Sequence, residues 1–233
     1  MNQSPGALPS QLGVKPVAQL STGFLSQAFV WMFAGLLLTA VVSWLVGSNQ
    51  RLVEMAASLY LPLLLGQFVL VVVISAAINR LSALAALLLF FIYSATMGVT
   101  LSFIFIAYEF GSIATAFLSA SAMFGGAALY GAVTKRSLAS MSGLLVMALI
   151  GIIAASFLNL LIFKSATFDL GISILGVLVF VGLTAWNVQK ISRGDYAAMT
   201  GSMEKGAVIG ALSLYLDFIN IFLFLLRIFG GRR

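Results

Sequence analysis

The acidic residue Asp217 lies in the middle of an apolar run, SLYLDFINIFLFLLRIFGG, which covers residues 213–231. Its immediate neighbours are Leu, Tyr, Phe and Ile, and none of them carries a charge that could pair with a carboxylate. An ionisable group in such surroundings either forms a structural hydrogen bond or takes part in moving an ion or a proton. Asp217 is therefore the first candidate for a functional residue.

Histidine and cysteine are both absent from the chain. Without them there is no Ser-His-Asp triad, histidine-bound zinc, thiol nucleophile or disulfide. An aspartyl protease needs two facing acids, and Asp217 is the only acid well inside an apolar run. The phosphate-binding pattern GxxxxGK[ST] is also absent. We therefore predict that the protein is not an enzyme and has no cofactor. A carboxylate must supply any response to pH near neutrality.

The composition indicates which solvent surrounds the chain. Of the 233 residues, 62% are hydrophobic and 8% are charged, whereas about a quarter of the residues in a soluble domain are charged. Too few polar residues remain to cover a globule in water. We therefore predict an integral membrane protein whose first partner is the lipid bilayer.

Seven apolar runs have the length of about 20 residues that a helix needs to cross the hydrocarbon. They predict an all-α bundle of seven transmembrane helices that forms one domain, residues 24–233. Residues 1–23 are rich in Pro, Ser and Gly and are predicted to form a flexible cytoplasmic tail. A short interfacial helix is expected in the connector 190–205. The seven predicted spans are residues 24–47, 55–78, 83–107, 112–133, 141–163, 171–189 and 206–229.

Basic residues between the runs predict the orientation. If the N-terminus is cytoplasmic, seven basic residues lie on that side and two lie on the other, which is the bias of the positive-inside rule. The net charge of +6 is thus assigned to topology, and no nucleic-acid partner is expected. The seven are Lys15, Arg80, Lys135, Arg136, Lys190, Arg193 and Lys205, and the two are Arg51 and Lys164.

The last run leaves two topologies open. Its 24 residues suffice for a full crossing, which we favour, but a crossing places Arg232 and Arg233 outside, against the charge bias. A re-entrant segment that returns to the cytoplasm is the alternative. Glu109 and Asp169 fall in connectors on the outer side and are expected to be solvated.

Helical spacing places Asp217 on the same side of its helix as Gly206, Gly210, Ser213 and Asn220. Small residues four apart allow helices in lipid to approach closely, so this side is expected to face the bundle interior. Arg227 is ten residues away, about 15 Å along the helix axis, so a partner for Asp217 must come from another helix. The candidates at the cytoplasmic ends of spans are Arg80, Lys135, Arg136, Asn187 and Lys190.

Three segments resemble the Bax inhibitor-1 family, in particular its bacterial inner-membrane branch: YLDFINIFLFLLRIFGG (215–231), LTAWNVQKI (183–191) and LYGAVTKRSL (129–138). The resemblance extends from Phe24 to the end of the chain. It implies a seven-helix bundle with the last helix central, in the bacterial inner membrane. It also implies a pH-sensitive calcium leak, in a family whose eukaryotic members restrain cell death.

In that family an aspartate pair senses pH, and an arginine at the end of the second helix interacts with the pair. Asp217 matches one acid and Arg80 matches the arginine, but Asn187 stands where the other acid is expected. Two close carboxylates do not both ionise easily, whereas a carboxylate beside an amide has no such repulsion. The amide can donate a hydrogen bond to Asp217, and the pair offers calcium one negative charge instead of two.

The residues and the resemblance together predict a calcium-permeable leak or ion-homeostasis protein with a blunted response to pH. Asp217 would be the ion- and proton-responsive group and the calcium ligand, Asn187 its partner, and Arg80 a latch cation. Ser213, Asn220, Gly206 and Gly210 would support this helix. The alternative is a non-conducting membrane regulator that binds a membrane protease or a stress-response partner.

Overall fold

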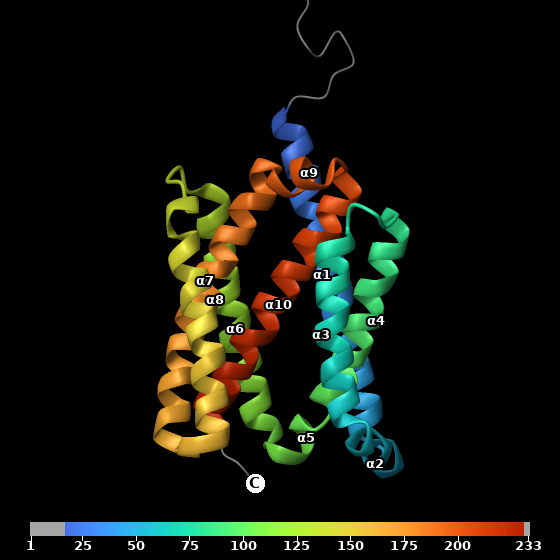
Figure 1. Ribbon diagram of the computed structural model, residues 1–233, viewed down its shortest axis with the longest axis vertical. Helices are drawn as coiled ribbons and strands as arrows, with labels where there is room; N and C mark the ends of the chain where they lie inside the picture. Colours follow the sequence, from blue (N-terminus) through green and yellow to red (C-terminus); the bar gives the residue numbers. More distant parts are fainter. Residues whose placement is uncertain (1–16, 231–233) are drawn as a thin grey trace, which may run out of the picture.

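The computed structural model describes residues 17–230 (Figure 1). Within this range seven helical segments are long and apolar enough to cross a membrane, which confirms the predicted seven-helix membrane bundle. A π-helical turn, Asn159–Phe163, continues the fifth of these segments. The α-helices are α1 (Val17–Gly47), α2 (Gln50–Ser58), α3 (Tyr60–Ala77), α4 (Ala83–Leu101), α5 (Ile104–Ala107), α6 (Phe110–Val133), α7 (Ala139–Leu158), α8 (Ala166–Arg193), α9 (Asp195–Thr200) and α10 (Met203–Phe229).

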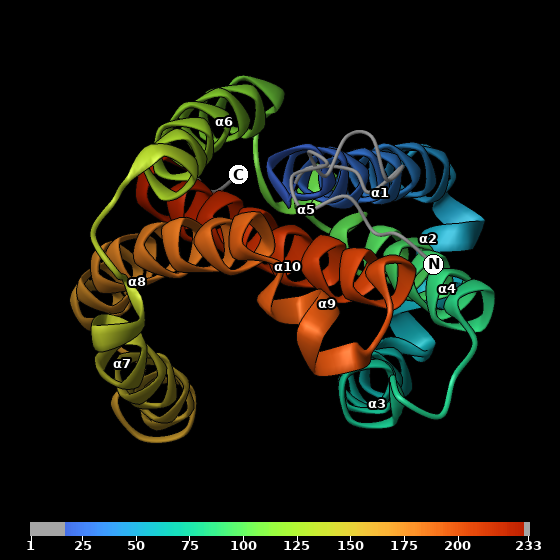
Figure 2. The same ribbon diagram turned by 90° about the horizontal axis from the view of Figure 1, so that it is seen from above.

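Helix α10 is the most buried span of the bundle. In its most apolar stretch 78% of the residues are buried, against at most 33% in any other span. It packs against α8, α1, α6, α9 and α4. Seen from above, α10 runs between α1 and α4 on one side and α6 and α8 on the other (Figure 2). The helix that carries Asp217 is therefore surrounded by protein over most of its length.

Helix α1 begins at Val17 and not at residue 24. The first 16 residues of the predicted tail lie outside the described residues. The second predicted span, 55–78, is divided into α2 and α3, with Leu59 between them. Pro62 explains the division, because it has no N–H to donate to the carbonyl of Ser58 and its ring would clash with that carbonyl in a continuous helix. Helix α3 alone supplies the span.

Helix α8 is longer at both ends than the predicted span 171–189. The hydroxyl of Ser165 accepts a hydrogen bond from the backbone N–H of Phe168 and caps its start, while Gly194, with φ 77°, ends it. The prediction that Asp169 lies in a connector is wrong, because Asp169 is in the first turn of α8, where its side chain is partly exposed. The short helix expected in connector 190–205 is present as α9.

Helix α10 traverses the whole bundle. It starts beside the end of α8, with which it is connected through α9, and near its own end Arg227 lies 3.6 Å from Asp169 at the start of α8. A re-entrant segment would bring the end of α10 back toward α9. The structure therefore has the geometry of a full crossing, with Arg227 at the end of the bundle opposite α9.

Gly206 and Gly210 allow α10 to approach its neighbours closely. A Cβ atom on Gly206 would lie 2.7 Å from the backbone nitrogen of Ala197, and one on Gly210 would lie 3.0 Å from the Ile191 side chain. These contacts fit the packing predicted from the small residues in the sequence. They hold α9 and the end of α8 against the first turns of α10.

The substitution Gly206→Ala is expected to lower the free energy of unfolding by about 1–3 kcal/mol, because its methyl group meets backbone that cannot rotate away. Gly126→Ala in α6 is the matched control, since a Cβ there has nothing within 4 Å. Thermal unfolding in detergent measures both. Equal melting temperatures for the two variants would contradict the proposed packing role of Gly206.

Candidate functional site

Asp217 and Asn187 meet between α10 and α8. Both side chains are buried, with 4% and 7% of their surface exposed. Nδ2 of Asn187 donates a hydrogen bond of 2.8 Å to Oδ2 of Asp217, which is the predicted pairing. Of the predicted partner candidates, Asn187 is thus the one that the fold brings to the carboxylate.

Tyr196 of α9 extends this pair into a chain of hydrogen bonds. Its hydroxyl donates to Oδ1 of Asn187 at 2.8 Å, and it lies 3.2 Å from the hydroxyl of Ser213. The carbonyl of Ile209 lies 2.9 Å from the Ser213 hydroxyl and competes with Tyr196 for its one hydrogen. Because Oδ1 of Asn187 accepts from Tyr196 while its Nδ2 donates to Asp217, the two contacts together hold the amide with its donor toward Asp217. The connector therefore orients the partner of the acid.

Tyr196 remains a hydrogen-bond donor at physiological pH. Burial raises the pKa of Tyr196 to about 12, and the negative charges of Asp217 and Asp195 act in the same direction, while the hydrogen bond with Ser213 opposes them. A neutral phenol at this position cannot act as a proton switch near neutrality. Its function in the site is to fix the geometry of Asn187.

Replacing Tyr196 with phenylalanine is expected to reduce the free energy of unfolding by about 1–3 kcal/mol, because Oδ1 of Asn187 loses its buried donor. The pKa of Tyr196 is higher in the folded chain than the value of about 10 in an unfolded one. The contribution of this residue is therefore complete below about pH 10 and falls as the pH rises toward 12. Unfolding measured across this alkaline range should show the parent and the variant converging.

The matched control is Tyr130→Phe, at a tyrosine that is 51% exposed. It should leave the free energy of unfolding unchanged. A Tyr196→Phe protein as stable as the Tyr130→Phe protein would show that the phenol does not hold Asn187.

The pair faces a cavity of about 690 Å³ that lies among α3, α7, α8 and α10. Its polar lining includes Asp217, Asn187, Ser213, Asn220 and Gln67. The remaining lining is mostly apolar and comes from α3 and α7, which lie on the same side of α8 and α10 (Figure 2). A carboxylate that is buried in protein thus has access to a space large enough for a hydrated ion.

Neither Arg80 nor Lys190, which the sequence suggested as partners of Asp217, contacts its carboxylate. Arg80 is exposed beyond the end of α3, and within residues 17–230 no ion pair joins it to Asp217. The latch between these residues stays a prediction. The Nζ atom of Lys190 lies over the rings of Tyr196 and Trp186, at 4.1 and 4.6 Å from their centroids. Lys190 therefore stabilises the aromatic side chain that orients Asn187.

The site offers an ion oxygen atoms but little charge. In the part of the chain that the structure describes, no three Asp, Glu, His or Cys side chains cluster as they do in a tight metal site. A calcium ion at Asp217 would complete its shell with amide, hydroxyl and water oxygens.

Comparison with known families gives a match over the whole bundle. A family model described as inhibitor of apoptosis-promoting Bax1 matches residues 21–233, a range that contains all seven spans and every residue of the site. The chain belongs to this family. The resemblance inferred from the sequence segments around Asp217, Asn187 and Arg136 is thereby confirmed.

Relatives of this Bax inhibitor family member occur in several bacteria, and some of them are named as membrane proteins. The inner membrane protein YbhL of Escherichia coli strain K12 is 45% identical over 226 residues, which cover 94% of this chain and 96% of YbhL. An uncharacterized protein of Deinococcus radiodurans is 42% identical over 219 residues, with 94% of each chain covered. An uncharacterized membrane protein of Streptococcus pyogenes serotype M1 is 46% identical over 165 residues, 70% of this chain and 71% of its own.

The functional residue that sequence reasoning missed in this family member is Tyr196. It lies in a polar connector whose local pattern, GDYAAM, indicates a turn and a short helix and no site. Its role arises because α9 folds back onto α10 at Gly206 and directs the phenol toward Asn187. A long-range contact of this kind leaves no periodic signal in the sequence.

Proposed function

We propose that this protein is a calcium-permeable leak or ion-homeostasis protein of the bacterial inner membrane, with a cytoplasmic N-terminus. The observation that supports the proposal best is the buried carboxylate of Asp217, which has one hydrogen-bond partner and lines a cavity of about 690 Å³. Intramembrane acids with such access typically belong to ion or proton pathways. The names of the relatives support the location.

In this proposal each residue of the site has a distinct role. Asp217 provides the charge that attracts the ion and the group that binds a proton, while Asn187 holds the carboxylate in place at any pH. Arg80 is the latch cation of a second state in which it reaches Asp217. Two states of different ion access are what a gate requires, and protonation of Asp217 would shift the population between them.

Calcium flux into proteoliposomes, recorded with an internal calcium indicator, tests the proposal. The protein should conduct across about pH 5 to 8, the range in which histidine, absent from this chain, is ordinarily the titrating side chain. Protein-free liposomes are the control. The absence of calcium flux at every pH would remove this function.

One observation favours a second candidate, a membrane regulator that conducts nothing and binds a membrane protease or a stress-response partner. The neighbour of Asp217 is an amide, so the site offers a divalent ion one negative charge. A structural acid would need no more than this hydrogen bond. The two functions differ in the Asp217→Asn variant, which should lose flux if the protein is a channel and keep partner binding if it is a regulator.

A further inference from the structure

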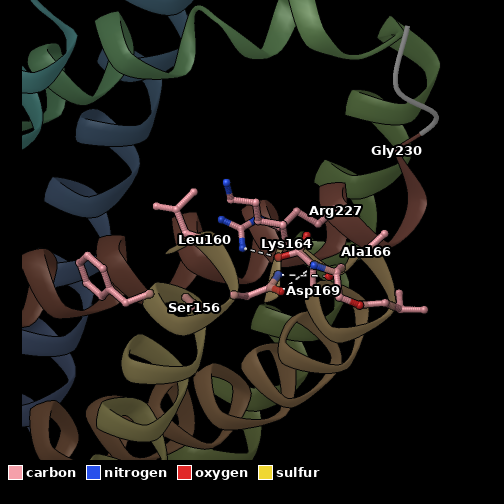
Figure 3. Close-up of a pocket in the computed structure, with 11 residues that line it drawn as sticks. Ser156, Leu160, Lys164, Ala166, Asp169, Arg227 and Gly230 are labelled. Atoms are coloured by element: carbon pink, nitrogen blue, oxygen red, sulfur yellow. Dashed lines mark hydrogen bonds and ion pairs between the residues drawn. The ribbon is translucent and has the colours of Figure 1, made fainter. Parts of the chain in front are cut away.

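A second cavity, of about 1020 Å³, lies at the outer end of the bundle near the ends of α7 and α10 and the start of α8. Lys164, Asp169 and Arg227 lie close together in its wall (Figure 3). This cavity and the one that Asp217 lines have Ser156, Phe157 and Arg227 in common. The two cavities therefore form one continuous groove with a charged end and an apolar body.

The charged end is held in place by the local fold. Lys164 ends the π-helical turn Asn159–Phe163 in a left-handed conformation, with φ 46°. The side chain of Asn159 accepts a hydrogen bond from the backbone N–H of Ser165 and donates one to its carbonyl. These contacts fix the loop that carries Lys164 beside Arg227. The side chain of Arg227 is 40% exposed, so guanidinium donors remain available beyond its contact with Asp169.

The charges at this end suit a phosphate. Lys164 and Arg227 supply two positive charges and Asp169 one negative charge, so the wall keeps a net positive charge. Arg and Lys together bind a phosphate through a forked pair of donors and a point charge. The groove also has apolar rims, since Phe68 and Phe157, which line its two sides, are 71% and 60% exposed. It is therefore open toward the region that lipid tails occupy.

The depth of the groove matches one lipid tail. Arg227 and Asp217 are ten residues apart on α10, about 15 Å along its axis. One leaflet of the hydrocarbon core is also about 15 Å thick, half of its total of about 30 Å. A tail anchored by its phosphate at Arg227 would therefore reach the level of Asp217.

We propose that this groove binds an anionic phospholipid, with its phosphate on Lys164 and Arg227 and one acyl chain along α7 and α10 toward Asp217. Lipid binding itself follows from the shape and charge of the groove. Its consequence for ion access to Asp217 rests on the proposed function, because a tail in the cavity would compete with an ion for the same space.

Trp186 provides the test, because it lines the groove near its deep end. The full chain, with Trp31 and Trp44 replaced by phenylalanine, is placed in nanodiscs that contain increasing fractions of phosphatidylglycerol brominated near the tail end. Quenching of Trp186 should saturate at a low fraction of this lipid. Brominated phosphatidylcholine, which has no net charge, should require a higher fraction.

Three substitutions examine the charged end. Lys164→Asn removes a positive charge but keeps a residue that tolerates the left-handed backbone conformation. It should raise the half-saturating lipid fraction about fivefold, which is the effect of one basic residue at a lipid surface. Asp169→Asn should lower this fraction, because it removes the negative charge. Arg51→Gln, at the exposed cation of α2, should leave it unchanged.

The lipid site would be overturned by quenching that rises linearly without saturation, or by a Lys164→Asn protein that behaves like the Arg51→Gln protein. Weaker lipid binding after Asp169→Asn would also overturn the lipid site. Such a result would mean that Arg227 serves a structural role as the ion-pair partner of Asp169. None of these readouts involves calcium. A failure of the proposed ion-leak function therefore leaves the lipid result intact, and the reverse also holds.

Discussion

Calcium flux into proteoliposomes is expected to fall about tenfold and to lose its dependence on pH when Asp217 is replaced by asparagine. The substitution keeps the shape of the side chain and an oxygen that can accept the hydrogen bond from Asn187. It removes the one charged side chain that is buried among the described residues. A tenfold change corresponds to about 1.4 kcal/mol, a modest part of what a carboxylate offers a divalent cation in partly buried surroundings.

Two further variants separate charge from packing. Asp217→Ala also leaves the Nδ2 group of Asn187 without its acceptor, so it should reduce stability by about 1–3 kcal/mol in addition to reducing flux. Glu109→Gln makes the same change from acid to amide at an exposed position at the start of α6, and flux should remain at the level of the parent. No calcium flux in either the parent or Asp217→Asn, together with partner binding retained in the variant, would instead identify the protein as a regulator.

The substitution Asn187→Asp is expected to increase the pH dependence of calcium flux several-fold. The side chains of Asn187 and Asp217 are 2.8 Å apart, and two carboxylates at that distance repel one another when both are ionised. They would share one proton at low pH and separate when the proton leaves, and the pair would then titrate as a unit. The second negative charge should also increase the affinity for calcium. Flux across about pH 5 to 8 for parent and variant measures the effect.

The control for this prediction is the exchange of both residues, Asn187→Asp together with Asp217→Asn. This double variant has one acid and one amide, as the parent does, so its pH dependence should return to the parental level. If the double variant shows the same steep pH dependence of flux as Asn187→Asp, the effect comes from placing an acid at position 187. Repulsion between two carboxylates would then not be its cause. An identical response of parent and Asn187→Asp would contradict the coupled-pair explanation for this chain.

Much of the fold could be predicted because lipid imposes a simple rule on sequence. A span must be helical and about 20 residues long, so composition alone indicated seven crossings, and the structure has seven helices of that kind. The predicted helix boundaries were wrong where a proline or a capping residue sets the end of a helix. Pro62 divides the second run into α2 and α3, and Ser165 starts α8 early enough to include Asp169. The apolar composition of a segment shows that it can span the membrane, but capping residues and prolines decide where each helix starts and ends.

The candidate site was predicted in part. Helical spacing directed Asp217 toward the interior together with Gly206, Gly210 and Ser213, because residues three and four apart share a side of a helix. It could not identify which residue of which other helix would face the carboxylate. Asn187 was one of several candidates, and the resemblance to the Bax inhibitor family rather than any spacing selected it. Arg80, which the same resemblance suggested, is exposed in the structure.

By itself, the sequence determined that this chain is a seven-span membrane protein, that it has no histidine or cysteine chemistry, and that Asp217 is a lone acid within a span. Only the tertiary structure decided that Tyr196 orients Asn187, that Lys190 lies over two aromatic rings, and that Arg227 pairs with Asp169 beside a groove. The physical reason is that burial and helix orientation follow from local composition, because each span meets the same solvent. Contacts between helices follow from the packing of residues that are far apart in the chain, and no local pattern records them.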